Sequence, residues 1–270
     1  MTETPQRERA RHPLDLGGKV GVVTGGNRGI GLGIARGLAA AGCDVAVWAR
    51  DLEQNRKAEE ECTGLSGAVA AFSCDVLDEE SVIGALAATL ARFGRVDGLF
   101  ANAGIGGGGR TPFTEQTTAE WERMLGVNLL GARRVASHVL QVMVRQIAEG
   151  TAKSGRIVLT SSSAAKLGTA FNQHYAASKA GLVAMARGIA VEYGRHNITA
   201  NALLPGYVRT DMVGDLLANQ KFTDRVMPRL AIRRFGEPAE MAGLCIYLMS
   251  DLSSYHTGDA ITVDGGFTVS

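Results

Sequence analysis

The sequence predicts an α/β fold in which one parallel, doubly wound sheet of seven strands is flanked by helices. Short apolar runs alternate with longer segments of helical period, which is typical of a parallel sheet with helical crossovers. Most of the apolar runs are continuous rather than alternating, as expected of strands that are buried on both faces. The chain has 270 residues, 46% of them hydrophobic, which is enough for one large core.

The seven expected strands are short runs rich in Val, Ile, Leu and Ala. They are Val20–Val23, Val45–Trp48, Val69–Phe72, Val96–Phe100, Arg156–Thr160, Ile198–Leu203 and Ala260–Val263. The first helix follows a glycine-rich turn and places Ile30, Ile34 and Leu38 on one face. The other helices are expected over Asp51–Glu61, Ser81–Phe93, Thr118–Ile147, His174–Tyr193 and Pro238–Met249. The helical period weakens between Tyr207 and Leu230, where we expect a loose segment.

Composition and charge exclude several classes of protein. The net charge of +1 gives no general attraction to nucleic acid or to an anionic membrane. No run approaches about 18 consecutive apolar residues, so we expect no membrane span. The polar start Met1–Pro5 lacks the apolar core of a signal peptide, which favours a cytoplasmic protein. The 35 glycines have no three-residue period, so they do not indicate collagen.

We expect residues 1–15 to form a flexible N-terminal arm and residues 16–270 to form a single catalytic domain. The arm is charged, carrying Arg7, Arg9 and Arg11, and has no apolar period. The cysteines lack Cys-x-x-Cys or metal-ligand spacing, and the histidines form no ligand pattern, so we expect reduced thiols and no metal site. The residues in question are Cys43, Cys62, Cys74, Cys245, His138, His174, His196 and His256.

A glycine cluster between the first strand and the first helix predicts a nucleotide site. It reads Thr24-Gly25-Gly26-Asn27-Arg28-Gly29-Ile30-Gly31. Backbone N–H groups at a helix N-terminus attract phosphate. Gly25 permits the tight turn, Gly29 lets the backbone approach a pyrophosphate, and Gly31 lets helix and strand pack closely. This position in the alternating pattern is that of a Rossmann-like sheet.

The spacing Gly-x-x-x-Gly-x-Gly after Thr24 resembles that of the short-chain dehydrogenase/reductase family. Further motifs follow in the order of that family, and the resemblance extends from Lys19 to the C-terminus. They are Asp75 after the third strand, Asn102-Ala103-Gly104 after the fourth, Asn128 in the long helix, Ser162 after the fifth strand, Tyr175-x-x-x-Lys179, and Pro205-Gly206 with Thr210. A Tyr-x-x-x-Lys pair is weak by itself, whereas the ordered set is specific.

The resemblance implies a catalytic set of Asn128, Ser162, Tyr175 and Lys179. Tyr175 and Lys179 are four residues apart, so they share one face of a helix. Tyr175 would exchange a proton with the substrate oxygen, and the Lys179 ammonium would lower the tyrosine pKa. Ser162 would stabilise the developing alkoxide, with Ser161 as the less favoured alternative. Asn128 would bind a water that connects to Lys179.

The resemblance also implies a nicotinamide cofactor. NAD-preferring relatives carry an acidic residue where this chain has Ala49, whereas Arg50 and Arg28 can meet a 2′-phosphate. We therefore expect NADP(H) in preference to NAD(H). The use of NAD(H) remains an alternative, because Asp51 could reach the ribose or neutralise Arg50. The expected cofactor-binding residues are Thr24, Gly25, Asn27, Arg28, Gly29, Ile30, Gly31, Arg50, Asp75, Val76, Asn102, Ala103, Gly104, Tyr175, Lys179, Pro205, Gly206, Val208 and Thr210.

The function these patterns predict is an NADPH-dependent carbonyl reductase or alcohol dehydrogenase. A 3-oxoacyl thioester, a sugar, a steroid or a small ketone would each be a suitable substrate, in either direction. A catalytically silent NAD(P)-binding regulator or scaffold is the alternative. Enoyl reductases of the superfamily fit less well because they place more residues between Tyr and Lys. The resemblance implies a homotetramer or dimer. The expected substrate walls are Phe171, Asn172, Met212, Val213, Leu216 and Leu217, and Gly106–Gly109 would be a flexible loop.

Overall fold

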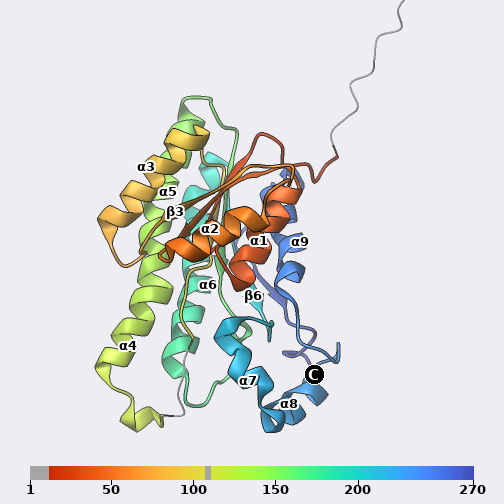
Figure 1. Cartoon of the computed structure of the whole chain (residues 1–270). Helices are drawn as coiled ribbons and strands as arrows, with labels where there is room; N and C mark the ends of the chain where they lie inside the picture. Colours follow the sequence, from red (N-terminus) through yellow and green to blue (C-terminus); the bar gives the residue numbers. More distant parts are fainter. Residues whose placement is uncertain (1–11, 107–110) are drawn as a thin grey trace, which may run out of the picture.

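The computed structural model describes residues 12–106 and 111–270, in which a twisted sheet lies between two layers of helices (Figure 1). The arm expected over residues 1–15 and the loop expected over Gly106–Gly109 therefore lie largely outside the described residues. The sheet has seven strands in the order β3-β2-β1-β4-β5-β6-β7, with every neighbouring pair parallel. The predicted fold class is confirmed.

The strands agree with the predicted runs to within one or two residues. Their bounds are β1 Val20–Thr24, β2 Asp44–Ala49, β3 Val69–Ser73, β4 Gly98–Ala101, β5 Gly155–Thr160, β6 Ile198–Pro205 and β7 Ala260–Val263. β6 ends two residues later than expected, at Pro205, and β4 begins two residues later, at Gly98 rather than Val96. At β4 the cause is local, because the Val96 backbone bonds to the Gln146 side chain instead of a neighbouring strand.

Helices cover both faces of the sheet, as a parallel sheet requires. On one face α3 (Glu79–Phe93), α5 (Ala132–Ala148) and α6 (Gln173–Tyr193) enclose the larger apolar core. On the other face α1 (Gly29–Ala40) and α9 (Ala242–Met249) enclose a second core. Helix α2 (Leu52–Glu61) packs beside β3, at the edge of the sheet.

The long helix expected over Thr118–Ile147 is not continuous. It consists of α4 (Thr118–Leu125), a π-helical segment (Gly126–Gly131) and α5. A Cβ on Gly131 would lie 2.7 Å from Val76 Cγ2, so the helix passes very close to the segment after β3. π-helical segments often occur at functional sites, and this one contains Asn128.

The segment expected to be loose, Tyr207 to Leu230, contains two short helices. They are α7 (Gly214–Ala218) and α8 (Gln220–Val226), and they rest on a small apolar cluster of their own. Tyr207 meets the rings of Phe222, Phe235 and Phe267 edge to face, which supplies packing that helical period alone does not reveal. The remaining short helices are 3₁₀ turns at Phe113–Glu115, Ser163–Ala165, Gly194–His196, Asp211–Val213, Met227–Arg229, Pro238–Met241 and Asp251–Ser253.

Candidate active site

The candidate site lies at the carboxyl ends of the central strands, where the strand order changes direction between β1 and β4. Ligands of open α/β sheets bind at this kind of switch point. The Thr24 hydroxyl at the end of β1 accepts hydrogen bonds from the N–H groups of Asn102 and Ala103, both at 3.0 Å. Thr24 therefore joins the ends of β1 and β4 and holds the Asn102-Ala103-Gly104 motif beside the glycine turn (residues 25–31).

The glycine turn is shaped by residues that cannot carry a side chain. Gly25 and Gly29 have φ values of 62° and 53°, in the left-handed region that favours glycine. A Cβ on Gly31 would lie 2.1 Å from the Gly25 carbonyl oxygen. The turn leads into the N-terminus of α1, whose backbone N–H groups can bind phosphate. This cradle fits the pyrophosphate of a dinucleotide.

The end of β2 presents Arg50 to solvent, with 69% of its side chain exposed. Its guanidinium lies 3.7 Å from the Asp75 carboxylate rather than pairing with Asp51. Asp51 instead caps α2 by accepting a hydrogen bond from the Gln54 N–H. In this structure Asp51 therefore does not neutralise Arg50. Asp75 is the carboxylate that lies near the Arg50 guanidinium. Val76 follows Asp75 and is buried.

The α6 pair is placed as its spacing predicts. The Lys179 ammonium is 5.7 Å from the centre of the Tyr175 ring, is almost fully buried, and donates to the Thr160 carbonyl at 2.8 Å. The Ser162 side chain lies close enough to the Tyr175 hydroxyl to lower its pKa. Ser161 points elsewhere, because its hydroxyl donates to the Lys179 carbonyl at 2.7 Å. The geometry thus brings Ser162, Tyr175 and Lys179 together.

The electrostatics differ from the expectation for this pair. Burial raises the pKa of Tyr175, and the neighbouring Ser162 side chain lowers it by less. Burial also lowers the pKa of Lys179 to about 8. The pKa of Tyr175 is therefore raised rather than lowered as expected, because burial of the phenol disfavours its charged form.

Asn128 uses its side chain to hold the irregular segment that follows β4. Its carbonyl accepts from the Ile105 N–H at 2.8 Å, and its amide donates to the Ile105 carbonyl at 3.0 Å and to Ser178. A Cβ on Gly104 would lie 3.1 Å from the Asn128 carbonyl oxygen and 3.5 Å from Lys179 Nζ. Asn128, Gly104 and Lys179 are consequently close neighbours.

The segment after β6 closes the site from the other side. Gly206 donates its N–H to the Val263 carbonyl at 3.0 Å, and Val208 is buried and bridged to Gly236. The methyl group of Thr210 would lie 3.1 Å from a Cβ on Gly29, so the segment reaches across to the glycine turn. The cofactor-binding residues expected from β6 thus lie beside those expected from β1.

A hollow of about 240 Å³ adjoins this segment and is lined by Arg209, Thr210, Gly214, Leu217 and Ala218. Among the other expected substrate walls, Phe171 is exposed with a φ of 63°, and Met212 is exposed beside Gly106. Asn172 precedes α6, and Val213 ends a 3₁₀ turn. The side chain of Leu216 lies outside the described part of the chain.

Two sets of residues near the site were missed by the sequence reading. Gln116 donates to Gln173 at 2.8 Å and accepts from the Trp121 indole at 3.0 Å, beside the start of α6. Asn55 of α2 is buried and bonded to Asn27 of the glycine turn. A buried asparagine inside an otherwise polar helix gives no signal in the periodicity.

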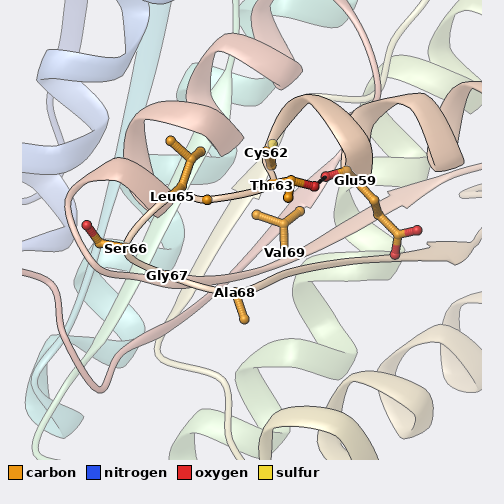
Figure 2. Close-up of a pocket in the computed structure, with 9 residues that line it drawn as sticks. Glu59, Cys62, Thr63, Leu65, Ser66, Gly67, Ala68 and Val69 are labelled. Atoms are coloured by element: carbon orange, nitrogen blue, oxygen red, sulfur yellow. Dashed lines mark hydrogen bonds between the residues drawn. The ribbon is translucent and has the colours of Figure 1, made fainter.

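A second hollow, of about 390 Å³, lies between the end of α2 and the start of β3 (Figure 2). It is at the opposite, amino-terminal edge of the sheet. The carboxylate of Glu59 accepts from the Ala71 N–H at 2.7 Å.

Over residues 12–106 and 111–270, no group of His, Cys, Asp and Glu side chains could hold a metal ion. Within the same ranges, no helix has the length and apolarity that crossing a bilayer needs.

Fold and site define a dinucleotide-binding oxidoreductase, and comparison with known proteins supports this class. The family model described as "Enoyl-(Acyl carrier protein) reductase" matches residues 24–268. The 2,5-dichloro-2,5-cyclohexadiene-1,4-diol dehydrogenase of Sphingobium indicum is 37% identical over 94% of this chain and 98% of its own length. The 3-oxoacyl-[acyl-carrier-protein] reductase of Chlamydia pneumoniae is 34% identical over 94% and 99%. The chain belongs to the short-chain dehydrogenase/reductase family.

Solved structures agree with this assignment. A putative gluconate dehydrogenase of Agrobacterium tumefaciens superposes with a TM-score of 0.89 at 34% identity, over 96% of this chain and all of that one. The 3-oxoacyl-[acyl-carrier protein] reductase of Brucella melitensis, determined in complex with NAD, gives a TM-score of 0.87 at 31% identity, over 93% and 98%. The chain is thus an NAD(P)-dependent dehydrogenase/reductase that acts on a CH–OH group.

Proposed function

We propose that this chain is an NADPH-dependent carbonyl reductase or alcohol dehydrogenase, with residues 16–270 acting as one catalytic domain. The observation that carries the proposal is the grouping of Ser162, Tyr175 and Lys179 beside Gly104, in the segment after β4, and near the glycine turn. A side-chain proton donor is thereby held next to a cradle for a dinucleotide. The substrate is a ketone or a secondary alcohol.

In the proposed mechanism the side chains handle the oxygen of the substrate. The bound nicotinamide supplies or accepts a hydride at the substrate carbon. Tyr175 gives its proton to the carbonyl oxygen in reduction and takes it back in oxidation. Ser162 donates a hydrogen bond to the same oxygen and stabilises its developing charge. Lys179 keeps a positive charge beside the tyrosine, and Asn128 holds a water that links the lysine to solvent.

The proposed cofactor contacts follow the three parts of a dinucleotide. The glycine turn, including Asn27 and Ile30, binds the pyrophosphate. Asp75 and Val76 receive the adenine, while Asn102, Ala103, Gly104, Tyr175 and Lys179 receive the ribose. Pro205, Gly206, Val208 and Thr210 receive the nicotinamide. Arg28 and Arg50 bind the 2′-phosphate, which makes NADP(H) preferred over NAD(H). The capping role of Asp51 supports this preference.

We further propose a homotetramer or dimer in the cytoplasm. The names of the relatives span diol, 3-oxoacyl and gluconate substrates, so the proposal includes 3-oxoacyl thioesters, sugars and small ketones. Light scattering tests the assembly, and a monomer would contradict it. Fractionation of cells tests the compartment.

The experiment that tests the function is a screen of cofactor oxidation over these carbonyl classes, with NADPH and NADH in parallel. We expect turnover of at least one class and a higher rate with NADPH. NADPH binding without turnover of any class would overturn the enzymatic proposal and favour a silent nucleotide-binding protein. A rate with NADH that equals or exceeds the NADPH rate would overturn the cofactor preference.

A further inference from the structure

Asn55 lies on the inner face of α2, with 4% of its surface exposed. Its side-chain carbonyl accepts from the Asn27 amide at 2.9 Å, and its own amide donates to the Ala49 carbonyl at 3.0 Å. One buried side chain therefore links the glycine turn to the end of β2. Asn27 is buried as well, so the amide–amide bond is shielded from water.

The two residues joined by this bridge each precede one of the cations proposed to bind the 2′-phosphate. Arg28 follows Asn27, and Arg50 follows Ala49. Both arginines are exposed residues, and the backbone of the turn and of the β2 end sets the points from which their side chains extend. We propose that Asn55 is a positioning residue that holds the glycine turn and the end of β2 at the separation that a 2′-phosphate requires. This inference rests on the proposed NADP(H) preference.

The chemistry of the bridge supports a local role. Substituting Asn55 with an apolar residue leaves the buried Asn27 amide without its partner, which is unfavourable unless the backbone moves. The Ala49 carbonyl keeps its hydrogen bond from the Cys74 N–H at 3.1 Å but is no longer joined to the glycine turn through Asn55. A separate hydrogen bond, from the Gly25 N–H to the Trp48 carbonyl at 2.7 Å, still joins the turn to β2. The turn is thus expected to stay joined to β2 at Gly25, while the separation of Asn27 and Ala49, from whose neighbours the two arginines extend, is no longer held by a side chain.

The test is to measure dissociation constants for NADPH and NADH in the full-length chain, for the wild type and for Asn55→Leu. We expect the NADPH constant to rise about tenfold, while the NADH constant changes by less than about threefold, because NADH lacks the phosphate that the arginines bind. Asn55→Ala serves as a second variant if the leucine disturbs folding. An equal change for both cofactors, or no change for either, would overturn the inference.

Gln146 supplies a matched control. It is a buried amide that also bridges backbone groups, accepting from the Val96 N–H at 2.9 Å and donating to the Val96 carbonyl at 2.7 Å, at the opposite edge of the sheet. Gln146→Leu should lower thermal stability and leave the ratio of the two constants unchanged. A shift of the ratio in this control would show that general destabilisation mimics the effect, and would contradict a specific role for Asn55.

A double-mutant cycle separates this inference from the proposed function. In an Arg50→Ala background the effect of Asn55→Leu on NADPH binding should shrink to less than about threefold, because the cation that the bridge positions is gone. Full additivity would overturn the inference while leaving the proposed function intact. A wild type that binds NADH as tightly as NADPH would instead overturn the cofactor preference, and the inference with it.

Discussion

The Lys179 ammonium lies 5.7 Å from the centre of the Tyr175 ring and donates to the Thr160 carbonyl at 2.8 Å. This relationship anchors the lysine to the end of β5 and sets it under the tyrosine. The amide of Asn128 and the segment at Gly104 border the same space. The ends of β4 and β5 and helix α6 thereby bring a proton donor and a cation together.

Lys179 should make the activity depend on pH near the lysine's pKa of about 8. Below that pH the ammonium is present, and above it the side chain is neutral. The raised pKa of Tyr175 keeps the phenol protonated over the same range. We expect kcat/KM for carbonyl reduction to fall above about pH 8. Steady-state rates over about pH 6 to 10 test this, with Lys57→Met as a surface control of unchanged profile. A flat or rising profile would contradict the role of Lys179.

Ser162→Ala should reduce kcat about 10²- to 10³-fold, because one donor to the developing alkoxide is lost. Ser161→Ala removes a hydrogen bond to the Lys179 carbonyl instead. It should lower stability by about 1 kcal/mol and keep kcat within a few-fold of the wild type. Steady-state kinetics and thermal unfolding of both variants give the comparison. The opposite order of kcat losses would assign the catalytic hydroxyl to Ser161.

Arg50→Ala should weaken NADPH binding about 10- to 100-fold, since a charge-assisted contact with the 2′-phosphate is lost. NADH binding should change little. Asp75 lies 3.7 Å from the Arg50 guanidinium, so the variant also releases that carboxylate. Fluorescence titration with both cofactors measures the effect. Equal weakening of NADPH and NADH would show that Arg50 does not recognise the phosphate.

Gly31→Ala should lower the free energy of unfolding by about 1–3 kcal/mol, because the new Cβ would collide with the Gly25 carbonyl. It should also weaken cofactor binding, since the glycine turn must move. Gly84→Ala is the matched control, because its Cβ would enter open space in the middle of α3. That variant should gain about 0.5–1 kcal/mol. Urea unfolding compares the two, and equal stability of both variants would rule out the predicted collision.

The fold was readable from the sequence because buried parallel strands and their crossover helices leave a strong periodic signal. The glycine turn was also readable, since φ values such as that of Gly29 demand glycine. Tertiary packing decided the rest. The π-helical segment around Asn128 arises where a helix meets another segment, and the Asn55 bridge is a single buried contact between distant residues. The raised pKa of Tyr175 depends on burial, which spacing does not report.

The most direct test of the proposed mechanism is Tyr175→Phe, which removes the proposed proton donor and keeps the aromatic ring. NADPH binding and NADPH oxidation should be measured on the same preparation, with a carbonyl substrate that the wild type reduces. If Tyr175 is the proton donor, the variant still binds NADPH and has no measurable turnover. Turnover at the wild-type rate would contradict this role of Tyr175.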